Sequence, residues 1–578
     1  MLSLPQRNRL LQRLRFLYGE EAERLLARVD ALFGRYGVDL SGREDTPSRY
    51  DERSSVLITY GDSICAEGER PLRTLRRFLH KHVRGTVSTV HLLPFFPYSS
   101  DDGFSVIDFR QVDPGLGQWE DISELGRTFE LMFDLVLNHC SRRSEWFQDF
   151  VTGIAPARWY FLPMDPETDL SAVVRPRSSP LLTKTSTRDG PAWVWTTFSE
   201  DQIDLNWQNP DVLFEFLDIL FLYLARGCRI FRLDAVAYLW KELGTSCLHL
   251  PQTHEVVKLL RDLLSWTVPE AMLLTETNVP HAENISYFGE GDEAHMVYNF
   301  SLPPLLLHAF LREDGSLLKE WLGSLPALPP GQTFFNFTAS HDGIGVRPLQ
   351  GLVSDEELDW LVEQIRRRGG RVSMKSDSGG GQSPYELNIT YRDALGDPGD
   401  PRRGQQRFLC SQAVALALPG VPGVYIHSLF GTRNDEEGLE ASGRNRSINR
   451  RKWREADLLE WLRDPNGGAW IYRSYLKILT VRRQQRAFHP DGKMTLLETD
   501  APLLGFLRVS PDGGETVLCL FNLAGKRKAL GTGKLRRRAG IREELRLVDL
   551  VRGRTLPRGQ KELRLEPFGF QWLQVTGG

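Results

Sequence analysis

Several apolar runs of the sequence end in side chains that can carry a charge or move a proton. These are Asp134 with His139, Arg232 with Asp234, Glu276, and His341 with Asp342. Any one pair alone could be a structural ion pair. Carboxyl and imidazole groups are the side chains that most often transfer protons in enzymes, and burying unpaired charges is costly. Four separate runs that end in this way therefore favour a working site over isolated ion pairs.

Arg232 and Asp234 stand two positions apart in GCRIFRLDAV, residues 227–236. Residues two apart share one face of a strand, so both side chains are expected to point into the same cavity while Ile230 and Leu233 pack in the core. A nearby cation lowers the pKa of a carboxyl group. We therefore expect Arg232 to keep Asp234 ionised.

The charged residues need elements that bring them together, and short strand-like runs from residue 56 onward provide them. The runs span residues 56–60, 86–96, 131–139, 229–236, 271–277, 333–342 and 421–427. They alternate with longer amphipathic segments, which is typical of βα units with a parallel sheet. This many units predict an α/β fold, a (β/α)₈ TIM barrel, whose active site lies at the carboxyl ends of its strands.

The remaining segments divide the chain around this barrel. Residues 1–52 form a predicted helical extension that ends in a polar linker beginning near residue 42, and residues 489–578 alternate like an antiparallel β-domain. The barrel is assigned to residues 53–141, 203–344 and 406–488. Two insertions, a B subdomain at 142–202 and a B′ subdomain at 345–405, follow strand ends and are expected to wall a pocket.

Composition limits the partners. The 578 residues hold 72 basic and 75 acidic side chains, so no net field attracts nucleic acid or a membrane surface. The most apolar window, residues 212–225, is shorter than the roughly 20 residues of a membrane span and predicts a buried helix. Six cysteines without CxxC spacing and an N-terminus without a signal-peptide pattern predict a cytoplasmic protein that acts on small molecules. Its oligomeric state cannot be predicted.

Four of the motifs together resemble the signature regions of the α-amylase family of glycoside hydrolases, glycoside hydrolase family thirteen. They are DLVLNH (134–139), GCRIFRLDAV (227–236), LLTET (273–277) and ASHD (339–342). The resemblance implies a retaining mechanism with Asp234 as nucleophile, Glu276 as general acid and base, and Asp342 gripping sugar hydroxyls in the transition state. In a retaining pair the two carboxyl groups stand about 5 to 5.5 Å apart. His139 and His341 would donate hydrogen bonds to the sugar.

Further stretches are similar to the sucrose phosphorylase branch of that family: residues 90–109, SHDGIGV (340–346), YELNITYRDALG (385–396) and RSINR (446–450). This resemblance implies that Asp101 and Arg446 clamp the far hydroxyls of one terminal glucose and that Phe104 packs against its ring. Alternatively, Asp101 with the next aspartate forms an ordinary turn before a glycine.

A phosphorylase needs cationic groups where phosphate attacks. The resemblance places Arg177 and Tyr385 nearest the phosphate, and arginine matches phosphate with two hydrogen bonds. Arg175 and Lys184 lie in the same basic stretch and are weaker candidates for binding phosphate. The stretch could also be a solvated loop.

Asn278 and Glu386 depart from the sucrose enzymes, where a histidine and a glutamine are expected. Both lie on the leaving-group side, and together with the long N-terminus they resemble relatives that phosphorolyse glucosylglycerate, glucosylglycerol or sucrose 6′-phosphate. We rank glucosylglycerate first, because a basic acceptor loop favours its carboxylate, and sucrose last. An α-glucosidase would share the catalytic residues, whereas an amylase-like transporter scaffold would lack them.

Inorganic phosphate is the predicted co-substrate, with no cofactor. Asn138 matches a position that binds calcium in many amylases. The sequence shows no cluster of calcium ligands around it, so we predict no metal.

Overall fold

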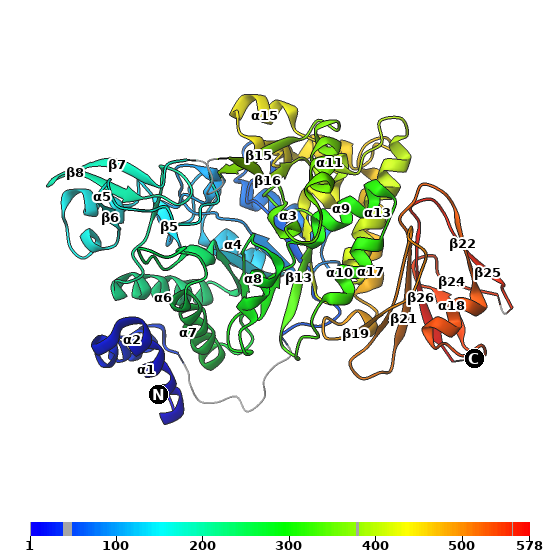
Figure 1. The fold of residues 1–578 in the computed structure, drawn as a ribbon, viewed down its shortest axis with the longest axis horizontal. Coiled ribbons are helices and arrows are strands. Elements are labelled where there is room, and N and C mark those ends of the chain that lie inside the picture. Colours follow the sequence, from blue (N-terminus) through cyan, green and yellow to red (C-terminus); the bar gives the residue numbers. More distant parts are fainter. Residues whose placement is uncertain (1, 39–48, 178, 377–380, 558, 578) are drawn as a thin grey trace.

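The computed structural model describes residues 2–38, 49–177, 179–376, 381–557 and 559–577, and a closed barrel of eight parallel strands lies at its centre (Figure 1). The strand order around the barrel is β1-β17-β13-β12-β11-β10-β4-β3. The strands are β1 (Val56–Thr59), β3 (Thr89–Leu92), β4 (Glu130–Val136), β10 (Cys228–Asp234), β11 (Met272–Thr275), β12 (Met296–Tyr298), β13 (Thr333–Phe337) and β17 (Val421–Tyr425). The predicted (β/α)₈ barrel is confirmed.

Nearly all residues of these strands are buried. This is expected when helices cover a parallel sheet, and it explains why the strands appear in the sequence as short apolar runs. Helices that wrap the barrel include α3 (Pro71–His82), α4 (Trp119–Gly126), α6 (Pro210–Ala225), α7 (Pro251–Thr267), α9 (Leu302–Arg312), α13 (Pro401–Ala417) and α17 (Ala469–Arg482). The apolar window at 212–225 lies in α6. Strand β12 was missed in the sequence, because three residues are too few to show a pattern. Among the described residues, no helix combines the length and apolar character that crossing a membrane requires.

The first insertion projects from one side of the barrel, in cyan in Figure 1. It carries α5 (Glu145–Thr152) and an antiparallel sheet of β6 (Pro163–Met164), β8 (Gly190–Trp195) and β7 (Leu182–Thr187). At its base, β5 (His139–Ser141) pairs with β9 (Gln202–Asp204). A buried ion pair reinforces this base, since the Lys241 Nζ lies 2.7 Å from Asp204 Oδ2 and donates to Asn138 Oδ1 at 2.6 Å.

The second insertion lies above the barrel and carries the sheet β14-β16-β15 (Figure 1). Its strands are β14 (Ile344–Gly345), β15 (Arg371–Ser376) and β16 (Gln382–Asn388), and its helices are η6 (Arg347–Leu349), α11 (Asp355–Arg366) and α12 (Tyr391–Ala394). Gly345 pairs with Glu386, so the backbone after β13 runs directly beside the strand that holds Tyr385.

Two helices precede the barrel, α1 (Leu4–Tyr18) and α2 (Ala22–Tyr36), and they pack against α6 and α7 (Figure 1). Arg13 of α1 is buried and donates to Asp262 at 2.5 Å and to Glu255 at 2.9 Å, both on α7. The polar linker predicted after this hairpin falls largely on residues 39–48, which lie outside the described residues.

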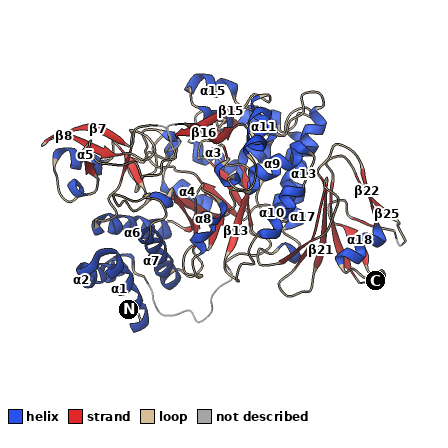
Figure 2. Ribbon diagram, in the orientation of Figure 1, coloured by secondary structure: helices blue, strands red, loops and turns tan. Residues whose placement is uncertain are grey.

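The C-terminal region is rich in strands, as Figure 2 shows. Its antiparallel sheet has the order β19-β20-β21-β26-β23-β24, and β22 (Lys528–Gly531) pairs separately with β25 (Glu562–Leu565). The sheet strands are β19 (Lys493–Leu496), β20 (Leu503–Val509), β21 (Thr516–Asn522), β26 (Phe570–Thr576), β23 (Arg546–Asp549) and β24 (Arg554–Thr555). Buried Arg508 of β20 donates to the carbonyl oxygens of Ala417 and His489 at 2.6 and 2.7 Å. These bonds fasten the sheet to the barrel.

Candidate active site

One pocket at the carboxyl ends of the barrel strands gathers all of the residues selected from the sequence for the site. They are Asp101, Phe104, His139, Arg177, Arg232, Asp234, Glu276, Asn278, His341, Asp342, Tyr385, Glu386 and Arg446. Strand β10 ends at Asp234, and Glu276 follows β11 directly. The barrel therefore brings together side chains that lie hundreds of residues apart, as the strand-end argument predicts.

Arg232 lies at the centre of four carboxylates. Its Nη1 donates to Asp134 Oδ1 at 2.5 Å and to Asp234 Oδ1 at 2.7 Å. The pairing of β10 with β4 places Arg232 directly beside Asp134, which explains the first bond. Its Nη2 lies 3.9 Å from an oxygen of Glu276 and from an oxygen of Asp342. The arginine thus draws together carboxylates from the ends of four strands.

Arg232 lowers the pKa of Asp234, as expected, but its effect does not set the net shift. Burial raises the pKa of Asp234 well above its usual value, and the opposing effect of Arg232 is smaller. Burial likewise raises the pKa of Glu276, with Arg232 again in opposition and Asp342 adding to the rise. The protonation of each of these carboxyl groups therefore depends on the charge of its neighbours.

The hydrogen bonds of Asp234 and Glu276 show which of the two carboxyl groups is better stabilised as an anion. Asp234 accepts a direct bond from the guanidinium of Arg232, which favours its ionised form. Glu276 Oε2 accepts only the weaker 3.2 Å bond from the backbone N–H of Ala235 among the described residues. Ala235 has a φ of 51°, a left-handed conformation that is unusual for a residue with a side chain. The bond from Arg232 therefore favours the ionised form of Asp234 more strongly than the bond from Ala235 favours that of Glu276.

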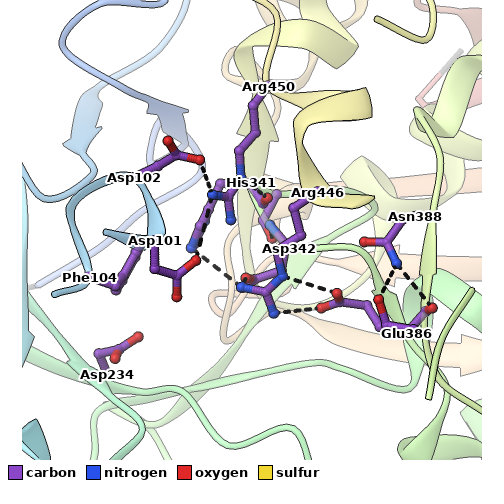
Figure 3. Close-up of polar contacts among 12 residues, drawn as sticks. Asp101, Asp102, Phe104, Asp234, His341, Asp342, Glu386, Asn388, Arg446 and Arg450 are labelled. Atoms are coloured by element: carbon purple, nitrogen blue, oxygen red, sulfur yellow. Dashed lines mark hydrogen bonds and ion pairs between the residues drawn. The ribbon is translucent and has the colours of Figure 1, made fainter. Parts of the chain in front are cut away.

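Asp342 stays ionised for a different reason. Burial opposes its charge, but Arg446, His341 and Arg232 together hold the pKa of Asp342 well below its usual range. The Arg446 Nη1 lies 2.7 Å from Asp342 Oδ1. Arg446 also makes two parallel bonds to Glu386, at 2.8 and 3.0 Å, as Figure 3 shows. Glu386 is only 1% exposed, so both of its oxygens face this arginine and not an open leaving-group site.

Arg450, which was not predicted from the sequence, lies beside Asp101 and Asp102 but is not among the residues that line the pocket (Figure 3). Its Nη1 lies 2.5 Å from Asp102 Oδ2 and 3.9 Å from Asp101 Oδ1. Asp101 and Asp102 both have left-handed backbone conformations, with φ of 51° and 49°. The alternative of an ordinary turn is therefore incomplete, because this strained turn is ion-paired to a distant segment. The only sequence signal for Arg450 is its place at the end of the RSINR motif.

The two predicted histidines differ in what they can offer a sugar. The ring of His341 stacks on Phe104 at 4.8 Å, and its Nδ1 is buried without a described hydrogen-bond partner. Burial lowers the pKa of His341 well below its usual value, although neighbouring Asp342 acts in the opposite direction. His139 Nε2 already contacts the carbonyl oxygen of Phe104 at 3.0 Å, which competes with its predicted bond to a sugar hydroxyl.

Arg177 also lines the pocket, and its guanidinium lies 5.5 Å from the ring centroid of Tyr385. Asn278 packs so tightly on Gly345 that a Cβ there would lie 2.6 Å from its amide. Arg175 and Lys184 do not line the pocket, and Lys184 is exposed on β7. Tyr238, Phe198 and Gln202 do line it. Tyr238 was missed because an aromatic residue in an apolar run resembles a core residue, and Phe198 and Gln202 belong to none of the recognised motifs.

Asn138 is the residue that matched an amylase calcium position. Its Oδ1 accepts a hydrogen bond from Lys241, whose ammonium also pairs with Asp204. Among the described residues, no group of three or more His, Cys, Asp or Glu side chains is arranged to hold a metal. The expectation of no metal stays a prediction.

Comparison with known proteins agrees with this geometry. Residues 85–317 match the catalytic domain of alpha-amylase. Glucosylglycerate phosphorylase of Spirochaeta thermophila is 48% identical over 524 residues, which cover 89% of both chains. The chain belongs to the alpha-amylase family. The enzyme of that name from Escherichia coli is 43% identical, covering 91% of this chain and 92% of its own length. Within the family, the chain falls in the glycoside phosphorylase branch.

A solved structure shows the same architecture. The sucrose 6F-phosphate phosphorylase from Thermoanaerobacter thermosaccharolyticum superimposes with a TM-score of 0.71 at 26% identity. The match covers 82% of this chain and 94% of that chain. Sucrose phosphorylase of Bifidobacterium adolescentis is 32% identical over 78% of this chain and 88% of its own. The chain thus shares its fold with a glycoside phosphorylase.

Proposed function

We propose that this protein catalyses the reversible phosphorolysis of 2-O-α-glucosylglycerate to α-glucose 1-phosphate and glycerate. The observation that carries the proposal is the difference in ion pairing among the three arginines that line the pocket. Arg232 and Arg446 are each paired with carboxylates, which suits a neutral sugar. Arg177 forms no ion pair among the described residues and suits an anion. The relatives with 43 to 48% identity are named for this reaction.

In the first step, Asp234 attacks the anomeric carbon while Glu276 gives its proton to the glycosidic oxygen, and glycerate leaves. Covalent glucosyl-enzyme remains. In the second step, a phosphate oxygen attacks the same carbon, the bond to Asp234 breaks, and Glu276 takes the phosphate proton. Two inversions at one carbon retain the α-configuration. Asp342, held ionised, is placed to grip hydroxyls as the ring flattens in the transition state.

Phosphate rather than water must attack the intermediate. We assign phosphate to Arg177 and Tyr385, because a guanidinium can bind two phosphate oxygens at once and the Tyr385 ring supports it from the side. No cofactor beyond inorganic phosphate is needed. We also propose that the protein acts in the cytoplasm, because its six cysteines are free and five of them are buried.

The test is a panel of glucosylglycerate, glucosylglycerol, sucrose and sucrose 6′-phosphate, each with inorganic phosphate, followed by release of α-glucose 1-phosphate. We expect the highest kcat/KM with glucosylglycerate. Release of free glucose at the same rate without phosphate would make the protein an α-glucosidase. A higher kcat/KM with sucrose 6′-phosphate would show that the acceptor is a sugar phosphate and not glycerate.

A further inference from the structure

Two arginines close to Tyr385 have no carboxylate partner among the described residues: Arg177, which lines the pocket, and Arg347, which lies just outside the lining residues. Among the described residues, neither Arg177 nor Arg347 takes part in an ion pair, whereas Arg446 makes bonds of 2.7 and 2.8 Å to two different carboxylates. Glu386, the acidic residue of the neighbouring strand, is fully occupied by Arg446. A cation without a counter-ion beside an enzyme pocket is an expected place for a ligand anion.

The backbone of the second insertion brings Arg347 to this place. The N–H of Val346 donates to the carbonyl oxygen of Tyr385 at 3.1 Å, so Arg347 follows directly beside the residue that supports Arg177. Arg347 begins η6 and is half-buried. Its Nε is buried without a hydrogen-bond partner among the described residues, so this donor has no protein acceptor.

Tyr238 also lines the pocket. Burial raises the pKa of its hydroxyl, and the positive charges of Arg347 and Arg177 both act against that rise. This agrees with a position of both guanidinium groups on the same side of the pocket as this phenol. Tyr238 can orient them toward an anion that enters beside Glu276.

We propose that Arg347 is a specificity-determining residue that binds the carboxylate of the glycerate unit, next to Arg177. This rests on the proposed function, in which glycerate is the leaving group and the acceptor of the reverse reaction. A guanidinium fork matches a carboxylate with two hydrogen bonds, whereas a neutral acceptor such as glycerol offers no charge to it. Arg347 thus gives preference for acids over polyols.

The experiment compares transfer from α-glucosyl fluoride to D-glycerate with transfer to glycerol, in the full-length chain. This donor carries no phosphate, so an effect on phosphate binding cancels from the ratio of the two rates. Arg347→Gln should lower the glycerate-to-glycerol ratio of kcat/KM by roughly ten- to a hundredfold. Arg347→Lys should restore part of it, since the charge returns without the fork.

The controls separate a lost contact from a damaged fold. Arg175→Gln removes an arginine that is close in sequence to Arg177 but lies outside the pocket. The glycerate-to-glycerol ratio of this variant should equal that of the unmodified protein. Fluoride release without acceptor reports formation of the glucosyl-enzyme and should persist in Arg347→Gln. An unchanged ratio in that variant overturns the role of Arg347 alone. Failure of the unmodified protein to use glycerate at all overturns the proposed function as well.

Discussion

At the scale of single residues, the site depends on which carboxyl group holds a proton. Asp234 and Glu276 are both buried, and burial raises the pKa of each. They differ in their partners, because Arg232 bonds directly to Asp234 and lies 3.9 Å from Glu276. A direct charged hydrogen bond stabilises the anion it touches. The difference between nucleophile and acid thus comes from one arginine.

Replacing Asp234 by Asn should remove the nucleophile and leave Arg232 with one carboxylate fewer. We expect turnover of every α-glucoside to fall by roughly 10⁴-fold or more, because an amide does not form the glucosyl ester. The measurement is kcat with glucosylglycerate and with α-glucosyl fluoride. Near-normal rates with either substrate would show that another group forms the intermediate.

Replacing Glu276 by Gln should separate substrates by their leaving groups. Release of glycerate needs a proton and should slow by roughly 10²- to 10⁴-fold, whereas release of fluoride should change far less. In the unmodified protein kcat/KM should fall as pH rises, since the acid is active only when protonated and burial moves its pKa upward. That alkaline decline should be absent in the variant. Equal slowing of both substrates would point to another proton donor.

At the scale of elements, strand pairing and insertions place the side chains that the motifs only name. The register of β10 with β4 puts Arg232 against Asp134, and the turn before Gly103 puts Asp102 against Arg450. The first insertion is held at its base by Lys241, which joins Asp204 of β9 to Asn138 after β4. This ion pair lies close to the turn that carries His139.

Replacing Lys241 by Met should loosen the first insertion, because Asp204 would keep its charge in a buried site without the ammonium. We expect a loss of roughly 3 to 5 kcal/mol in unfolding free energy, measured by urea denaturation, and faster limited proteolysis within residues 142–202. Asp457→Ala removes an exposed ion pair with Arg454 and is the matched control, which should leave stability nearly unchanged. Equal stability of the two variants would contradict the assigned role.

At the scale of the whole molecule, buried arginines join the outer regions to the barrel. Arg13 connects the N-terminal hairpin to α7, and Arg508 connects the C-terminal sheet to the end of α13. Arg482 of α17 donates to the carbonyl oxygens of Leu416 and Glu52. Each guanidinium satisfies buried oxygens that water cannot reach.

Replacing Arg508 by Met should preserve most of the apolar packing but leave the carbonyl oxygens of Ala417 and His489 without their donor. We expect a loss of roughly 2 to 4 kcal/mol in unfolding free energy, and a thermal transition in which the C-terminal sheet melts before the barrel. Differential scanning calorimetry checks this. A single unshifted transition would show that the apolar contacts alone hold the sheet.

The sequence by itself determined the barrel and thirteen of the residues that line the pocket, because strand ends and compact motifs are local features. Only the tertiary structure revealed β12, the raised pKa of Asp234, and the partners of Glu386. It also brought in Arg450 and Arg347, which no expectation had included. Burial and ion pairing depend on segments that are distant in the chain, so their balance at each carboxyl group is decided only when the folded barrel and its insertions surround it.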